Sequence, residues 1–282
     1  MGRNKKKRKR KAREEEPTLA ARADRYALYE QAVQSPEFDV AFLDRVFRKE
    51  FGRRPMLLRE DFCGTAAISC AFVRSRRERR AIGIDIDPEP LAWGREHNVA
   101  ALPRKRRHLV ELVQADVREI REPKADVVCA MNFSYCVFKT RDELRGYFEA
   151  ARANLRREGV LTLDVVGGSE TQEDDREDTR KIGRGVRYVW EQKRFDPVSY
   201  NARFAIHFLF RDGSALDHAF EYDWRLWTIP EIRELLLEAG FRRVDVYWEE
   251  TDSKTGEGNG RYRKVREAEA DPAWVACIAA IR

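Results

Sequence analysis

The feature that most constrains this chain is an alternation of short apolar runs with helical patterns over residues 56–168. Five runs predict strands, at 56–62, 81–86, 109–114, 125–131 and 160–166. Helical spacing of apolar residues separates them, over 66–76, after Asp87-Pro88 and over 141–156. Strands that alternate with helices in this way are typical of a mostly parallel, doubly wound α/β sheet.

The flanking segments follow other patterns. Apolar spacing predicts helices over 17–34 and 38–51, before the first strand. Strand-like runs at 186–195, 202–210 and 215–226 predict an antiparallel insertion, because an Arg211-Asp212-Gly213-Ser214 turn joins the last two. A helix at 229–239 and strands at 241–248 and 274–281 then resume the first pattern, and the last strand is expected to run antiparallel. The acidic stretch 170–178 and the polar stretch between the last two strands are expected to be loops.

These segments divide the chain into five parts. We expect a basic tail at 1–16 and N-terminal helices at 17–55. The core sheet follows at 56–168, an antiparallel cap at 169–227, and the C-terminal part of the core at 228–282. The net charge of +6 comes from the tail, because Met1 to Arg13 hold nine of the 55 Lys and Arg residues, leaving 46 against 49 acids. Such a tail is expected to be disordered and able to contact nucleic acid or acidic partners.

Composition excludes several classes of protein. The longest apolar run near the C-terminus, 274–281, is far too short to span a bilayer, and the basic start lacks the apolar segment of a secretory signal. We therefore expect a cytoplasmic protein. Five cysteines without CxxC spacing, and four histidines without metal-type spacing, indicate neither a disulfide framework nor a metal site.

Two motifs follow the first two predicted strands. The segment Leu58 to Ala66 (LREDFCGTA) brings a strand into a turn at Gly64, where the missing Cβ lets a ligand approach the backbone. Asp85 ends the second strand, 21 positions after Gly64. An acidic residue about 20 positions after such a turn hydrogen-bonds ribose hydroxyls in nucleotide-binding sheets. Asp85 is therefore predicted to bind a ribose.

Two more motifs follow the third and fourth strands. They are Gln114-Ala115-Asp116-Val117 and Met131-Asn132-Phe133-Ser134-Tyr135. Ligands of open α/β sheets lie beyond the carboxyl ends of the strands, so all four motifs are expected to meet at one site.

Taken together, the four motifs resemble those of class I S-adenosylmethionine-dependent methyltransferases. The resemblance implies a Rossmann-like fold and S-adenosyl-L-methionine as cofactor, with S-adenosyl-L-homocysteine as product. Its acidic, glycine-rich first motif corresponds to Glu60, Phe62, Cys63, Gly64 and Thr65, with Gly64 under the methionine part. Phe62 and Ala66 stand where the family often has glycine, whereas a Cys-Gly-Thr core occurs in some of its members. The segment 225–241 resembles the helix before the sixth strand of small-molecule members.

The same resemblance assigns the later motifs. Asp85 would hold the ribose diol, and Ile86 would lie against the adenine face. Asp116 would accept from the adenine amino group, and Val117 would donate its backbone N–H to the ring. Asn132 would lie near the sulfonium and amino end.

Methyl transfer from a sulfonium is an in-line displacement, so positioning and desolvation supply much of the rate and neither a metal nor a dedicated nucleophile is required. A general base is optional. Candidates near the acceptor are Tyr29, Tyr135 and His207 as catalytic residues, with Tyr222 and Trp224 beside them. The aromatic insertion suggests a cap over a small-molecule acceptor.

Three alternatives remain open from the sequence. Asn132-Phe133-Ser134-Tyr135 has the Asn-x-x-Tyr spacing that holds an extruded base, so a nucleic-acid amino methyltransferase using the basic tail is one. An NAD-dependent oxidoreductase is disfavoured by the missing GxGxxG. A protein that binds the cofactor without catalysis is the third. The acceptor and the oligomeric state are not given by the sequence.

Overall fold

The computed structural model describes residues 16–251 and 258–282, and its largest element is an eight-stranded sheet. The tail predicted at 1–16 lies outside the described residues, apart from Glu16. Five strands are mutually parallel: β1 (Leu57–Asp61), β2 (Arg80–Asp85), β3 (Val110–Gln114), β4 (Ala125–Ala130) and β5 (Leu155–Gly167). The strand order is β11-β10-β12-β5-β4-β1-β2-β3. In it β12 (Trp274–Ile281) runs antiparallel to β5 and to β10 (Arg243–Thr251), and β11 (Gly258–Val265) is antiparallel to β10.

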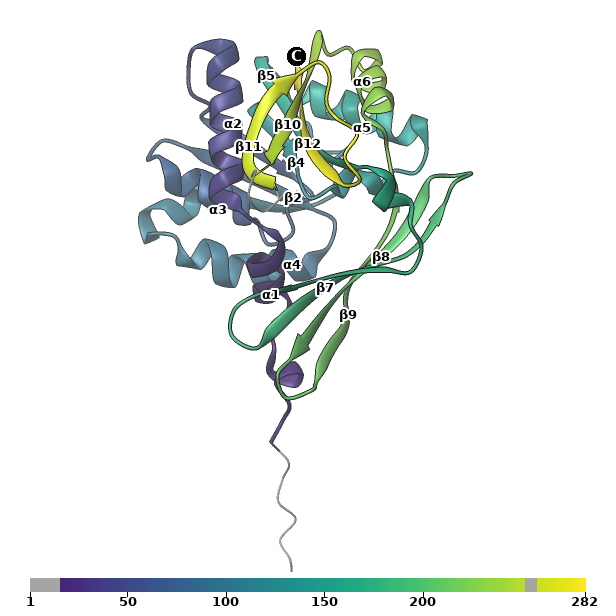
Figure 1. The fold of residues 1–282 in the computed structure, drawn as a ribbon. Coiled ribbons are helices and arrows are strands. Elements are labelled where there is room, and N and C mark those ends of the chain that lie inside the picture. The colour runs from purple at the N-terminus through teal and green to yellow at the C-terminus, as the bar shows by residue number, and fades with distance from the viewer. Residues whose placement is uncertain (1–15, 252–257) are drawn as a thin grey trace, which may run out of the picture.

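Helices cover both faces of this sheet (Figure 1). On one face, α2 (Pro36–Phe51) and α3 (Ala67–Ser75) pack on side chains of β1, β4 and β12. On the other, α5 (Arg141–Ala153) and α6 (Ile229–Glu238) pack on β4, β5 and β12. Strands buried by helices on both faces read as continuous apolar runs, which is why the sequence reveals them. The predicted Rossmann-like, mostly parallel sheet with an antiparallel C-terminal strand is confirmed.

A second sheet of four antiparallel strands lies beside the first (Figure 1). It consists of β6 (Arg176–Lys181), β7 (Val186–Asp196), β8 (Asn201–Phe210) and β9 (Ala215–Arg225), in that order. Its inner face, with Ile206 and Phe208 at the centre, packs on Leu28 and Tyr29 of α1 (Arg25–Val33). The predicted antiparallel insertion is confirmed.

Four short helical segments of 3-10 type, at Ala20–Arg22, Arg104–Leu109, Ser134–Val137 and Ser169–Gln172, complete the described chain. The helix α4 (Pro88–Gly94) continues into a π-helix at Arg95–Val99. No helix among the described residues has the length and apolar character needed to cross a membrane. All five cysteines are free and buried.

Three sequence expectations were wrong. The stretch 170–178 is not only a loop, because β6 begins within it at Arg176. The polar stretch after β10 contains β11. The helix expected over 17–34 is interrupted, because the Asp24 side chain accepts hydrogen bonds from Tyr26 N and Ala27 N and starts α1 anew.

Candidate active site

The turn after β1 forms the floor of the candidate site. It places three residues in the left-handed backbone region within five positions: Phe62 (φ 56°), Gly64 (φ 51°) and Ala66 (φ 60°). A side chain in this region costs on the order of 1 kcal/mol relative to glycine. Phe62 and Ala66, the two departures from the glycine-rich pattern, thus keep the backbone that glycine would favour.

Glu60 lies beneath this turn and not in the cavity above it. Its side chain, only 4% exposed, accepts a hydrogen bond from Ser69 N in the first turn of α3 at 2.7 Å. Ala66, the residue at the N-cap position, offers no side-chain cap. Glu60 therefore caps α3 from a neighbouring strand, because its carboxyl oxygen satisfies a backbone N–H of the first helical turn. Burial raises the pKa of Glu60 to about 8.

Asp85, at the end of β2, joins the turns after β1 and β2. One oxygen accepts from Gly64 N at 2.7 Å and the other from Asp87 N at 3.0 Å. Desolvation by burial raises the pKa of Asp85. Ile86, the next residue, is 69% exposed. A half-buried carboxylate can accept hydrogen bonds from the hydroxyls of a ligand ring, and an exposed apolar side chain beside it can contact an apolar face of the same ligand.

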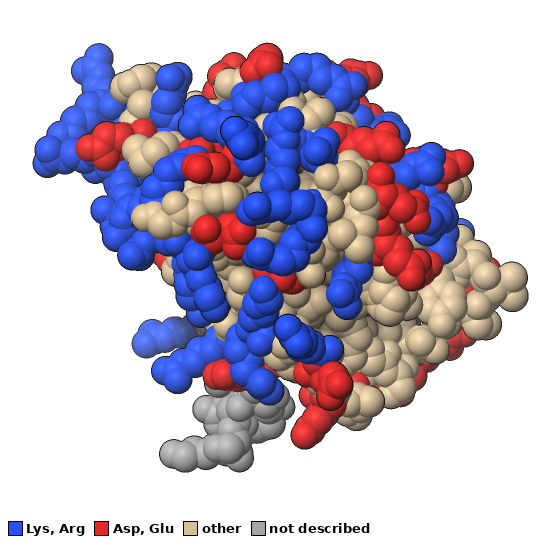
Figure 2. Space-filling model, turned by 90° about the horizontal axis from the view of Figure 1, so that it is seen from above, with Lys and Arg blue, Asp and Glu red and all other residues tan. Residues whose placement is uncertain are grey.

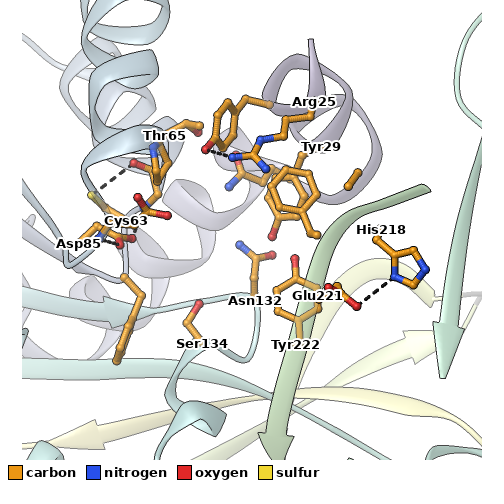
Figure 3. A pocket seen from close by; sticks show the side chains of 18 residues that line it. Arg25, Tyr29, Cys63, Thr65, Asp85, Asn132, Ser134, His218, Glu221 and Tyr222 are labelled. Atoms are coloured by element: carbon orange, nitrogen blue, oxygen red, sulfur yellow. Dashed lines mark hydrogen bonds and ion pairs between the residues drawn. The ribbon is translucent and has the colours of Figure 1, made fainter. Parts of the chain in front are cut away.

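The loop after β4 is held by a buried acid that the sequence did not single out. Asp164 of β5 accepts from Asn132 N at 2.8 Å and from Phe133 N at 2.9 Å. Both of these residues have left-handed backbones, at φ 57° and 56°. Two bonds to one carboxylate thus hold a strained loop and direct Asn132 toward the cavity (Figure 3). Burial raises the pKa of Asp164 to about 6.

Helix α1 forms the third wall and is hydrogen-bonded to the first motif. Glu30 accepts from Thr65 Oγ1 at 2.5 Å and from Asn98 Nδ2 at 2.6 Å, and Asn98 also donates to Thr65 O at 2.9 Å. At its other end, Asp24 accepts from Trp93 Nε1 at 2.7 Å. These bonds fix α1 against the turn after β1.

Strand β9 completes a cavity of about 470 Å³ (Figure 3). Tyr222 faces Tyr29 of α1, and Phe220 lies against Tyr29 with ring centroids 4.8 Å apart. Burial raises the pKa of Tyr29 to about 12 and that of Tyr222 well above its ordinary value. Both phenols are therefore neutral near pH 7 and can donate and accept hydrogen bonds.

Seven of the predicted site residues line this one cavity: Tyr29, Phe62, Cys63, Gly64, Thr65, Asp85 and Asn132. Tyr222, a further acceptor candidate, lines it too. Ile86 is adjacent in sequence to Asp85 but is not part of the lining.

Other predicted residues lie away from the cavity. The carboxylate of Asp116 is held by Arg118, whose Nη2 donates to it at 2.6 Å and keeps its pKa low, and the Val117 carbonyl accepts from Arg59. Tyr135 is 0% exposed, and its hydroxyl donates to Asp164 O at 2.9 Å, so it is a core residue.

His207 also lies apart from the lining. Its Nε2 is 3.0 Å from Glu191 Oε2, and its ring contacts that of His218 with centroids 4.9 Å apart. Its neighbours in β8, Ile206 and Phe208, pack toward α1 instead.

Sequence reasoning missed part of the lining, namely Arg25, Tyr26, Gln34, Asp87, Pro90, Ser134, His218, Ala219, Phe220 and Glu221. Tyr26 and Phe220 carried a usable signal, since both fall on segments already expected near the acceptor. The position of His218 could not be predicted, because a bulge between β8 and β9 and a left-handed backbone (φ 49°) set its direction. Among the described residues there is no group of three or more His, Cys, Asp or Glu that could hold a metal ion.

Comparison with known proteins agrees with this geometry. Residues 61–163 match the family described as "Methyltransferase domain". No curated protein matches the chain.

Solved structures share the fold over nearly the whole chain. An S-adenosylmethionine-dependent methyltransferase from Clostridium acetobutylicum has a TM-score of 0.64 at 16% identity, covering 91% of this chain and 96% of that one. DesVI from Streptomyces venezuelae has a TM-score of 0.64 at 19% identity, covering 91% and 95%. CalS10 from Micromonospora echinaspora, an amino pentose methyltransferase solved with S-adenosylmethionine bound, has a TM-score of 0.61 at 21% identity, covering 91% and 96%. Residues 61–163 are thus similar to a methyltransferase domain, and the chain shares its Rossmann-like fold with these solved structures.

Proposed function

We propose that this protein is an S-adenosylmethionine-dependent methyltransferase that acts on a small-molecule acceptor. The observation that carries the proposal is one cavity with two unlike walls. Gly64 and Asp85 lie on one side, where a nucleoside fits, and Tyr29 and Tyr222 lie on the other, on elements outside the parallel sheet. A cofactor and an acceptor would meet between them.

The residues present fit the cofactor. Asp85 offers carboxylate oxygens to a ribose diol, with the exposed Ile86 beside it for the adenine face. Glycine at position 64 leaves the backbone open, since nothing lies within 4 Å of where its Cβ would be. We leave Asp116 out of the proposed contacts because Arg118 already occupies its oxygens.

The charge around the site suits a cationic cofactor. Asp164 lies behind Asn132, and the Asp85 carboxylate borders the cavity. Carboxylates in a poorly solvated site interact more strongly with a positive charge than they would in water. The faces of Tyr29 and Phe220 add the attraction of aromatic rings for cations.

When bound, S-adenosylmethionine supplies an electrophilic methyl group. The chain's own contribution is to orient the cofactor and the acceptor and to exclude water. Asn132, held by Asp164, presents its amide to the cavity, and α1 covers the turn through Glu30 and Thr65. Tyr29 and Tyr222 are neutral and can donate to or accept from an acceptor's polar groups. Positioning of this kind accounts for much of the rate of a displacement.

For the acceptor we propose an amine on a sugar-like ring. Two structural neighbours are described as an amino pentose methyltransferase and a sugar N-methyltransferase. The rings of Tyr29 on α1 and of Phe220 and Tyr222 on β9 offer an aromatic wall in a cavity that polar groups also line. Such a surface suits a ring with polar substituents.

The proposal is tested by supplying S-adenosylmethionine with a panel of amino sugars and the matched hydroxyl sugars, and measuring S-adenosylhomocysteine release. We expect amino sugars alone to stimulate release. Tyr222→Phe should raise the KM for the sugar about fivefold and leave the Kd for S-adenosylmethionine unchanged, because loss of one hydrogen bond costs about 1 kcal/mol. Failure to bind S-adenosylmethionine at all would refute the function, whereas binding with stimulation only by hydroxyl sugars would refute the amine.

A further inference from the structure

A concentration of positive charge lies at the amino ends of β2 and β3, away from the cavity. Residues 74–80 and 104–107 together contain nine Lys or Arg residues and a single acid, Glu78. The part of the chain after Met1 to Arg13 has slightly fewer bases than acids, so the positive charge of these two segments contrasts with the rest of the chain. In the view of Figure 2, Lys and Arg side chains gather mostly toward the left, the side where Figure 1 draws α3.

The two segments form one surface, which we call the arginine edge: Arg74, Arg76, Arg77, Arg80, Arg104, Lys105 and Arg107. Its backbone is fixed by Arg106, whose Nη1 donates to Val73 O at 3.2 Å and to Arg74 O at 2.8 Å. Arg79 fixes the first segment from inside, since it pairs with Asp44 and stacks on the ring of Phe72 at 4.3 Å. All seven side chains of the arginine edge belong to exposed residues.

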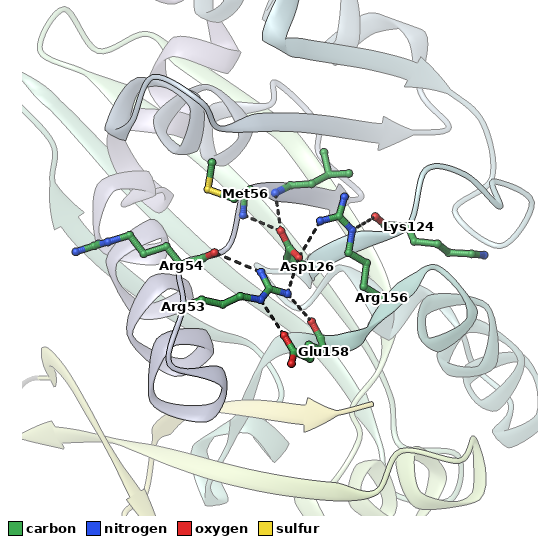
Figure 4. Close-up of polar contacts among 8 residues, drawn as sticks. Arg53, Arg54, Met56, Lys124, Asp126, Arg156 and Glu158 are labelled. Carbon is green, nitrogen blue, oxygen red and sulfur yellow. Dashed lines mark hydrogen bonds and ion pairs between the residues drawn. The ribbon is translucent and has the colours of Figure 1, made fainter.

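Most of this charge is not neutralised. Of the seven residues, only Arg74 has an ion pair among the described residues, with Glu37. The neighbouring strand ends differ (Figure 4). There Arg53 and Arg156 both pair with the buried Asp126, and Arg53 pairs with Glu158 as well. Acids thus neutralise Arg53 and Arg156, whereas six of the seven residues of the arginine edge have no acidic partner among the described residues. Of these six, Arg107 donates hydrogen bonds to the carbonyls of Ala100 and Leu102, which leave its positive charge in place.

The chemistry of the arginine edge favours phosphates. Six of its seven residues are arginine, whose planar guanidinium binds phosphate oxygens in a bidentate way. The exposed large apolar side chains of the described chain are elsewhere, at Phe38, Ile86, Val137, Val198, Tyr200 and Leu237. A protein interface is expected to present aromatic anchors and a membrane-bound surface apolar ones, and the arginine edge has neither.

We propose that the arginine edge binds the phosphate backbone of nucleic acid. The bound strand would be a docking platform and not the methyl acceptor. Arg80 and Asp85 stand at opposite ends of β2, five residues apart, which at about 3.3 Å per residue separates the arginine edge from the cavity by roughly 17 Å. This inference is independent of the proposed methyl transfer.

The test uses the full chain and a variant that combines Arg76→Gln, Arg77→Gln, Arg104→Gln and Lys105→Gln. Binding to a 20-base-pair RNA duplex and to a DNA duplex of equal length is measured by fluorescence anisotropy from 50 to 300 mM KCl. The control variant combines Arg184→Gln, Arg187→Gln and Arg203→Gln, exposed residues of the second sheet region. Circular dichroism checks that both variants are folded.

We expect the wild-type chain to bind both duplexes, because backbone recognition does not depend on sequence. The variant of the arginine edge should bind at least tenfold more weakly at 100 mM KCl, and the slope of log K against log salt should fall by about 3. The control should retain the wild-type slope. Three results would each overturn the proposal. They are equal slopes in the two variants, no duplex binding by the wild type, and binding to phosphatidylserine vesicles that depends on the arginine edge without binding to either duplex.

Discussion

Replacing Glu60 by glutamine tests whether a buried acid governs the pH dependence of stability. Burial raises the pKa of Glu60 from 4.5 to about 8, so the folded chain holds a proton that the unfolded chain releases above pH 4.5. A raised pKa in the folded state means that stability is greatest below the unfolded value and falls as pH rises toward the folded value. The loss approaches about 1.4 kcal/mol per pH unit between these limits, or roughly 2–3 kcal/mol from pH 5 to pH 7.

Glutamine keeps an oxygen that can accept from Ser69 N and has no proton to lose. Glu60→Gln should therefore gain roughly 2–3 kcal/mol relative to wild type between pH 5 and pH 7, measured by urea unfolding without cofactor. Glu78→Gln, at an exposed acid, is the matched control and should follow the wild-type curve. If the unfolding free energies of Glu60→Gln and wild type changed in parallel with pH, Glu60 would be ionised in the folded state and the reasoning would be wrong.

Two further substitutions test the strained turns. Asp164→Ala removes the acceptor for two backbone N–H groups and should lower the free energy of unfolding at pH 7.5 by about 3 kcal/mol, with weaker cofactor binding because Asn132 is released. An unchanged midpoint in urea would show that the loop holds its shape unaided. Ala66→Gly should raise the melting temperature, since φ is 60° there, by an amount equivalent to about 0.5–1 kcal/mol, whereas Ala71→Gly inside α3 should lower it. A lower melting temperature for both variants would argue against strain at position 66.

The sequence predicted the strands that carry several apolar residues and missed β6 and β11, two polar strands at sheet edges. The strands β4 and β5 carry long apolar runs because both of their faces are covered. The strand β6 has almost only charged residues, since it pairs on one side with β7 and is otherwise exposed. The edge strand β11 is similarly polar. Such strands form because their backbone pairs with a neighbouring strand, and this pairing leaves no apolar pattern in the sequence.

The candidate site was predictable where a residue's position is set by the strand and turn in which it lies. Gly64, Asp85 and Asn132 lie at the carboxyl ends of β1, β2 and β4 and line one cavity, as expected. The position of Asp164 depends on the pairing of β5 with β4, which brings a strand carboxylate under a loop about thirty residues earlier in the chain. Asp116 does not line the cavity, and its carboxylate oxygens are held by a local pair with Arg118 that the motif did not indicate.

The most direct test of the central claim is isothermal titration of the purified chain with S-adenosylmethionine, compared with Asp85→Ala and with Asp142→Ala. Asp85 borders the cavity at the end of β2, whereas Asp142 is an exposed residue of α5 outside the cavity lining. The account predicts one binding site per chain, a loss of at least a hundredfold in affinity for Asp85→Ala, and wild-type affinity for Asp142→Ala, with all three chains folded by circular dichroism. Wild-type affinity in Asp85→Ala would contradict it.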